Sequence, residues 1–239
     1  MSAGDLQALL SVQDLDTETD RARHRRVALP ERATLAEMDK RAAILEATLE
    51  EATSVRDEVA CRQVAAEQDL AATEQRRAAV SRRLYSGEVS ASRELQAMSA
   101  DVESLGARVS SLEDRILEIL EEREPLDARV GELEAEKDKL AAERQEAVAS
   151  LGSGEEAIDV ILEGLASQRA EAAALVPPAL LSDYEGIRAR LGGVGAARLV
   201  GSRCDGCHLT LPATEMDRIR HLPEGELVTC DQCGRILVP

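Results

Sequence analysis

A long run of apolar residues, spaced alternately three and four positions apart, constrains this sequence most. It extends from residue 95 to residue 151, and fourteen of its seventeen positions are apolar. The run comprises Leu95, Met98, Val102, Leu105, Val109, Leu112, Ile116, Ile119, Arg123, Leu126, Val130, Leu133, Lys137, Leu140, Arg144, Ala147 and Leu151. A sustained 3.5-residue repeat keeps one stripe of a helix facing a partner helix. The run therefore predicts a long helix in a coiled coil.

A weaker repeat of the same kind occupies residues 35 to 84. Its positions are Leu35, Met38, Ala42, Leu45, Leu49, Ala52, Arg56, Val59, Gln63, Ala66, Leu70, Thr73, Arg77, Val80 and Leu84. Between the two runs, Gly87 permits a turn, and Ser90 or Ser92 can cap the next helix. We predict an antiparallel hairpin with its turn near residues 85–92. One continuous helix that dimerises in parallel is the alternative.

Helix-breaking residues fall at matching heights on the two predicted helices. With a turn near residue 88, Pro30 faces Ala147, and the glycine-rich residues 152–154 lie close to the same level. Proline removes a backbone donor and glycine weakens a helix. We therefore predict a bend near residue 30 and residues 151–154.

Composition supports helices packed along a seam rather than around one thick core. The 239 residues include two tyrosines and no Trp or Phe, whereas compact enzymes use aromatic side chains to fill a core. The 46 acidic and 29 basic residues give a net charge of −17, which disfavours a general polyanion binder. No secretion signal or membrane-length apolar run is evident, so we expect a cytoplasmic protein.

The strongest chemical motif lies near the C-terminus. Cys204 and Cys207 form one CxxC pair, and Cys230 and Cys233 form a second pair after twenty-two intervening residues. Two such pairs provide four thiolates for one tetrahedral zinc ion, and a closed four-sulfur shell is structural rather than catalytic. Redox-active dithiols and an iron–sulfur cluster are the alternatives. The segments 227–229 and 236–238 are expected to form short strands beside the second pair.

The fold class is therefore mainly α: a long kinked antiparallel coiled-coil hairpin plus a small C-terminal zinc ribbon. We place the hairpin in residues 1–176, and a linker helix with the zinc ribbon in residues 177–239.

The remaining candidate residues do not form an enzyme motif. The histidines His208 and His221 are interpreted as surface residues, and Cys61 as a free, inert thiol. Residues 193–198 resemble a dinucleotide-binding loop only weakly and are interpreted as a linker. Without a Walker sequence, an HExxH motif or a catalytic triad, we expect no enzymatic activity.

Three groups of basic residues stand out in the sequence. At the predicted turn, the tip comprises Arg82, Arg83, Tyr85 and Arg93, and we interpret it as a partner site. In the ribbon, Arg218 and Arg220 are the nucleic-acid site of the alternative interpretation. A third group is interpreted as a solvated helix face paired with acids at i+4. It comprises Arg21, Arg23, Arg25 and Arg26.

Four segments together resemble a known family. They are residues 84–89, residues 93–96, residues 195–200 before the first cysteine pair, and residues 233–238. The chain resembles the bacterial coiled-coil hairpin proteins with a C-terminal four-cysteine zinc ribbon. The resemblance implies a kinked hairpin with a zinc domain at its base. Some relatives are implicated in binding an alternative sigma factor, secretion or flagellar components, or messenger RNA.

These observations favour a non-enzymatic adaptor, monomeric or weakly dimeric, that binds partner proteins through its tip and its ribbon. A nucleic-acid-binding regulator, using the ribbon or the basic tip, is the alternative. A hairpin that inserts its tip into RNA polymerase is a weaker analogy based on shape.

Overall fold

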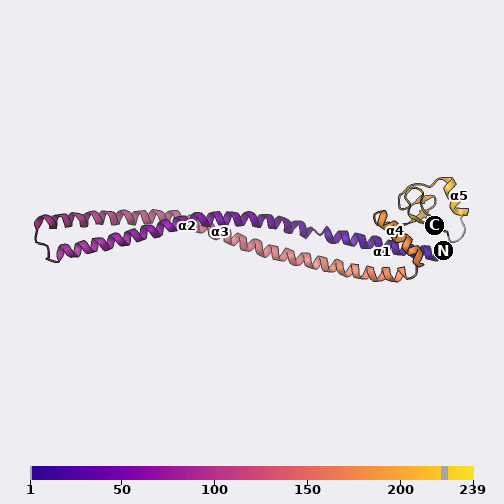
Figure 1. The fold of residues 1–239 in the computed structure, drawn as a ribbon, viewed down its shortest axis with the longest axis horizontal. Coiled ribbons are helices and arrows are strands. Elements are labelled where there is room, and N and C mark those ends of the chain that lie inside the picture. Colours follow the sequence, from indigo (N-terminus) through magenta and orange to yellow (C-terminus); the bar gives the residue numbers. More distant parts are fainter. Residues whose placement is uncertain (1, 222–225) are drawn as a thin grey trace. The chain divides into compact units, whose positions relative to one another are not determined.

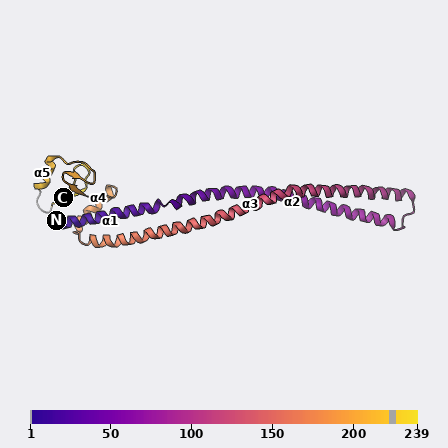
Figure 2. The same ribbon diagram turned by 180° about the vertical axis from the view of Figure 1, so that it is seen from behind.

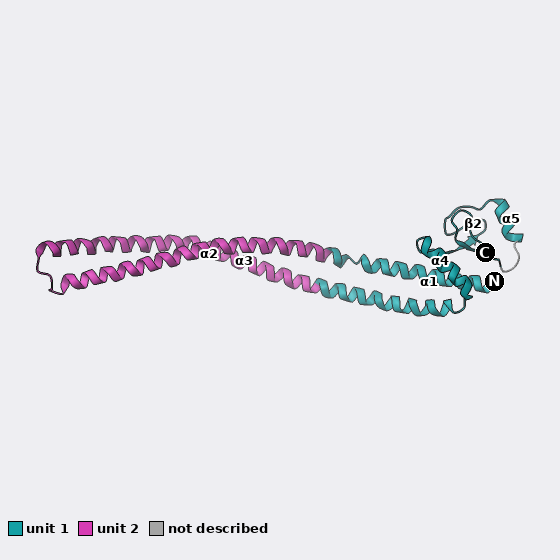
Figure 3. Ribbon diagram, in the orientation of Figure 1, with its two compact units in different colours: residues 1–33, 147–239 teal, residues 34–146 magenta. Residues whose placement is uncertain are grey.

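The computed structural model describes residues 2–221 and 226–239. The helices are α1 (Ala3–Val27), α2 (Pro30–Tyr85), α3 (Ser92–Ala173), α4 (Pro178–Arg190) and α5 (Ala213–His221), and the strands are β1 (Ala196–Val200), β2 (Arg203–Cys204) and β3 (Ile236–Val238) (Figure 1). The chain forms two compact units (Figure 3). We call residues 34–146 the hairpin unit, and residues 1–33 with 147–239 the terminal unit.

The hairpin unit confirms the predicted antiparallel hairpin and its seam. Parts of α2 and α3 run side by side, joined by the turn (Figures 1 and 2). Leu45 packs with Leu133 and Leu140, and Val59 and Ala66 pack with Ile119. Every fully buried residue of this unit lies on one of the two predicted repeats. These residues are Leu45, Val59, Ala66, Thr73, Leu105, Val109, Leu112, Ile119, Val130, Leu133 and Leu140.

The three basic residues in the predicted seam of α3 all contact α2. Arg123 donates to Gln63 at 2.9 Å, Lys137 to Glu46 at 3.3 Å, and Arg144 to Asp39 at 2.7 Å. Outside the seam, ion pairs such as Arg41–Glu136, Arg76–Asp101 and Arg83–Glu94 also link the two helices. Exposed pairs contribute little to stability. Their positions are nevertheless those expected for a turn centred near residue 88.

The turn between α2 and α3 depends on a glycine and a serine. Gly87 adopts a φ of 77°, in the left-handed region that favours glycine. The Ser86 hydroxyl donates to the Arg83 carbonyl and accepts from the Glu88 backbone N–H. Ser86 therefore makes the side-chain bonds at the end of α2, and capping of α3 by Ser90 or Ser92 stays a prediction.

The helix near the N-terminus is interrupted where Pro30 was expected to act. The helix α1 ends at Val27 and α2 begins at Pro30, a favourable first helical position for proline. In contrast, α3 continues through Pro125 and Gly152. A Cβ atom added to Gly154 would lie 3.5 Å from Leu29, so this part of α3 packs beside the interruption. The bend in both helices remains a prediction.

A hydrophobic core joins three parts of the terminal unit. Leu9 and Val12 of α1 pack with Tyr184 of α4 and with Ile236 of β3. The strands form a three-stranded sheet in the order β2-β1-β3, with β1 antiparallel to β2 and parallel to β3. The predicted domain boundary at residues 176–177 thus lies within this unit, between α3 and α4.

The sheet separates two cores because neighbouring side chains on a strand point to opposite faces. Ala196, Ile236 and Val238 face the core shared with α1 and α4. Ala197 and Leu237 face a second core that contains the cysteines. The strand β1 was not predicted. The expected strand at 227–229 is reduced to a bridge between Thr229 and Ile236.

A buried polar network also holds the terminal unit together. Asp16 of α1 is 4% exposed and accepts hydrogen bonds from Arg169 at 2.7 Å and from the Tyr184 hydroxyl at 2.8 Å. One turn earlier, Gln13 accepts from the backbone N–H groups of Gly195 and Ala196 at 2.7 and 3.2 Å. The network therefore connects α1 to α3, to α4 and to the start of β1.

The environment of Tyr184 predicts an unusual titration. Burial, followed by the hydrogen bond to Asp16, raises the pKa of Tyr184 well above the ordinary value of 10.0. The folded state thus favours the neutral phenol. The resulting stabilisation is complete below pH 10 and is lost as the pH rises further.

We expect the Tyr85→Phe variant, in which Tyr184 is the remaining tyrosine, to develop phenolate absorbance only well above pH 10 and together with loss of helix. The same variant unfolded in guanidinium should titrate near pH 10. Ionisation near pH 10 with the helix content intact would contradict this environment.

Candidate metal centre

Four cysteine thiols converge in the terminal unit. The Sγ atoms of Cys204 and Cys233 are 3.9 Å apart, as are those of Cys207 and Cys230, and all four lie within 4.8 Å of one another. A tetrahedron with zinc–sulfur bonds of about 2.3 Å has sulfur–sulfur distances of about 3.8 Å. The cluster therefore has the size and the chemistry of a four-thiolate zinc site.

The two CxxC pairs form similar turns. The backbone N–H of His208 donates to the Cys204 carbonyl at 2.8 Å, and that of Gly234 donates to the Cys230 carbonyl at 2.7 Å. Each donor directly follows the second cysteine of its pair, and both residues have left-handed φ angles, 62° for His208 and 71° for Gly234. The two pairs thus share one local backbone geometry, in which a left-handed residue closes the turn behind the second cysteine.

Gly206 is required by close packing rather than by its φ angle. A Cβ atom at this position would lie 2.6 Å from Cδ of Arg235 and 2.9 Å from the side chain of Ala197. Arg235 in turn donates to the Val194 carbonyl at 3.1 Å. This arginine supports the second cysteine pair, and nothing in its sequence position indicated that role.

The thiols differ in acidity. Burial raises the pKa of Cys204, and it raises the pKa of Cys230 to about 12. Burial opposes ionisation of Cys233 as well, but the backbone N–H and the side chain of Arg235 donate to its sulfur and lower the pKa of Cys233 to about 7. Zinc binding must therefore displace protons from the buried thiols.

The other candidate residues lie outside this cluster. His208 and His221 are exposed and are not part of the four-cysteine group. Arg218 of α5 forms ion pairs with Glu215 and, at 3.8 Å, with Asp231. Arg220 is exposed.

The tip residues are all exposed, and they lie at the end of the hairpin unit. Tyr85 is 82% exposed, and Arg83 pairs with Glu94 across the turn at 3.3 Å. Arg82 and Arg93 are likewise exposed. The structure thus presents the four tip residues on one short segment around the turn.

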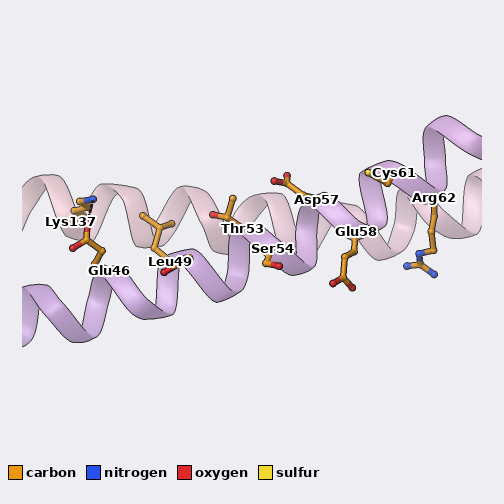
Figure 4. Close-up of a pocket in the computed structure, with 10 residues that line it drawn as sticks. Glu46, Leu49, Thr53, Ser54, Asp57, Glu58, Cys61, Arg62 and Lys137 are labelled. Carbon is orange, nitrogen blue, oxygen red and sulfur yellow. Dashed lines mark hydrogen bonds and ion pairs between the residues drawn. The ribbon is translucent and has the colours of Figure 1, made fainter.

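A hollow along α2 of the hairpin unit does not gather catalytic groups. Figure 4 shows Asp57 on one side of the helix and Glu58 and Arg62 on the other. Cys61, in the same region, is exposed and is not disulfide-bonded. Of the charged residues that line the hollow, Lys137 already pairs with Glu46 at 3.3 Å, and Arg62 pairs with Glu122.

Comparisons with known proteins agree with both parts of this architecture. Residues 12–192 match the model of the CT398-like coiled coil hairpin domain, and residues 203–237 match the C4-type zinc ribbon domain. The chain belongs to the CT398-like coiled coil hairpin family. It carries one structural zinc in a C4-type ribbon. Neither matching model describes an enzyme.

Relatives in sequence and structure cover nearly the whole chain. The uncharacterized protein Rv2229c of Mycobacterium tuberculosis is 34% identical over 253 residues, which cover 100% of this chain and 97% of the relative. A Mycobacterium smegmatis structure has a TM-score of 0.88 and 25% identity, covering 99% of this chain and 98% of its own. CT398 from Chlamydia trachomatis has a TM-score of 0.68 and 18% identity, with 98% and 96% covered, and shows the shared fold.

Within the residues that the structure describes, no helix combines the length and apolar character that crossing a bilayer requires.

Proposed function

We propose that this protein is a non-enzymatic zinc-binding scaffold that binds partner proteins through its tip and its zinc ribbon. The observation that carries the proposal is the contrast between its two tyrosines. Tyr184 is fully buried and hydrogen-bonded, whereas Tyr85 is 82% exposed at the turn. A tight turn needs no exposed aromatic ring, and tyrosine is enriched at the centres of protein interfaces.

The surrounding charges support a protein partner. Arg82 and Arg83 flank Tyr85 on a chain whose net charge is −17. Arginine beside tyrosine is a common combination in binding hot spots. A long acidic protein repels nucleic-acid phosphates over most of its surface.

We also propose Cys204, Cys207, Cys230 and Cys233 as the four zinc ligands. The support is the mutual proximity of the thiols and the two left-handed turns that follow the cysteine pairs. With all four positions taken by sulfur, the metal has no open site for substrate, so its role in this proposal is to stabilise the ribbon.

A nucleic-acid-binding regulator is the second candidate. Arg220 favours it, because this residue is exposed and, among the described residues, has no ion-pair partner. Arg218 does not favour it, because Glu215 and Asp231 already neutralise its guanidinium.

The tip is tested by replacing Arg82, Arg83 and Tyr85 together with Ala. All three side chains are exposed, so the free energy of unfolding should change by less than about 0.5 kcal/mol. Immobilised wild-type protein should retain partner proteins from a native lysate after nuclease treatment, and the triple variant should lose them at least about tenfold by quantitative mass spectrometry.

The matched control replaces Arg76 and Arg77, which removes two charges from the same helix and leaves Tyr85 in place. Equal capture by the triple variant would reject the tip as a partner site. Capture that nuclease abolishes, and that depends on Arg220, would instead support the nucleic-acid candidate.

A further inference from the structure

A groove in the terminal unit shares no lining residue with the tip or with the cysteine cluster. It has a volume of about 760 Å³ and is bounded by α1, by α3 and by the loop that precedes β1. Ile161 and Leu165, one turn apart on α3, supply apolar lining, and Val194 adds to it from the loop. Ile161 is 44% exposed and offers the accessible part of this lining, whereas Leu165 is 7% exposed and forms the floor beneath it.

The α1 side of the groove is basic. Arg21 and Arg25 lie one turn apart on α1 and line the groove together with His24. Within the described part of the chain, no carboxylate lies within ion-pair distance of these three residues. The other two members of this arginine run do pair with acids, although not at the expected i+4 spacing. Arg23 pairs with Asp20 three residues earlier, and Arg26 pairs with Glu155 and Asp159 of α3.

The carboxylates of the groove do not cancel this charge. Asp20 is paired with Arg188 and with Arg23. Glu18 also lines the groove, but its single negative charge stands against the two positive charges of Arg21 and Arg25. The free charge at the groove is thus net positive, on a protein whose total charge is −17.

The loop that precedes β1 lets a ligand in the groove come close to its backbone. Gly192 and Gly193 have φ angles of 69° and 100°, and both line the groove without a side chain. The loop is held in place, because the Gly193 carbonyl accepts from Gln13 at 3.2 Å. The groove is therefore a built feature of the fold rather than the consequence of a loose linker.

We propose that this groove binds an acidic amphipathic helix of a partner protein. The stretch of α1 from Thr17 to Arg25 is about 12 Å long, which matches roughly two turns of a bound helix. Apolar side chains of such a helix would pack on Ile161 and Leu165, and its glutamates, one turn apart, would meet Arg21 and Arg25. An apolar wall offers nothing to a phosphate backbone, which argues against a nucleic acid here. The site goes beyond the tip and ribbon surfaces, so its failure would leave the proposed function untouched.

The test uses the full-length, zinc-loaded protein and two probes. The dye anilinonaphthalene sulfonate, which is anionic and aromatic, reports occupancy of the groove by fluorescence. A synthetic amphipathic helix of about fourteen residues, built from Glu, Leu and Ala, serves as the competitor. We expect the peptide to displace the dye from the wild-type protein, and a version with Lys in place of Glu to fail.

In the double variant Arg21→Gln with Arg25→Gln, the peptide should bind about tenfold more weakly, because two exposed ion pairs are lost. Ile161→Ser should weaken both the dye and the peptide. Arg26→Gln and Val160→Ser are the matched controls, because they change a charge on α1 and an exposed apolar residue on α3 that do not line the groove. The ion-pair partners of Arg26, Glu155 and Asp159, do not line it either. Failure of the peptide to displace the dye, or equal losses in the control variants, would overturn the proposal.

Discussion

Replacing Cys230 by Ser is expected to abolish stoichiometric zinc binding and to unfold the ribbon. Cys230 is 1% exposed and lies in the core that also contains Cys204 and Leu237. Structural zinc in small four-ligand sites contributes on the order of 10 kcal/mol to folding of the site. The small apolar core on the cysteine side of the sheet cannot replace a contribution of that size.

The effect should not extend to the hairpin unit. The hairpin unit buries its own seam, so far-ultraviolet circular dichroism of the variant should retain most of the helical signal. Elemental analysis should find one zinc per wild-type chain and far less in the variant.

Cys61→Ser is the matched control, because Cys61 is exposed and lies outside the cluster. It should keep its zinc. Full zinc content in the Cys230→Ser variant would remove this cysteine from the ligand set. Iron with sulfide in the wild-type protein would replace the zinc assignment altogether.

The second large effect is expected for Asp16→Ala, which should lower the free energy of unfolding of the terminal unit by about 3 kcal/mol. Removing one member of a buried ion pair typically costs about 3–5 kcal/mol, because the partner charge stays buried. Arg188 also pairs with Asp16, at 3.4 Å. We expect the lower end, since Arg169 retains Glu185 and Arg188 retains Asp20.

Tyr184 serves as a probe for the loss of stability in the terminal unit. In a Tyr85→Phe background, fluorescence of the remaining tyrosine reports the core around α4 during denaturation. The matched control is Asp14→Ala on the same helix, whose exposed ion pair with Arg198 should contribute less than about 1 kcal/mol. Similar losses of unfolding free energy in both variants would show that the buried ion pairs of Asp16 stabilise the unit no more than an exposed pair does.

Much of the hairpin could be predicted because its information is local. A repeat of 3.5 residues places Leu45, Leu133 and Leu140 on helical stripes whatever the rest of the chain does, and the structure buries all three. The same holds for the two CxxC pairs, since their short spacing and backbone turns place two thiols together. Fold class, cofactor and family could therefore be inferred before any coordinates were available.

The strand β1 and the support of the cysteine cluster could not be inferred in this way. Alanine has a low propensity for β-strands, so Ala196 and Ala197 do not indicate one. They belong to a strand because β2 and β3 pair with β1 on either side. The position of Arg235 beneath Gly206 depends on the same assembly.

The polar contacts of α1 required the folded chain most of all. Gln13 bonds to the backbone of Gly195, and Asp16 to Tyr184, across separations of 182 and 168 residues. Such contacts produce neither a periodic pattern nor a motif in the sequence, because each one joins just two residues that lie far apart in the chain. The same is true of the groove beside Arg21 and Arg25. Whether an arginine on a helix is paired or free depends on which carboxylates folding brings near it, and only packing of distant segments sets that arrangement.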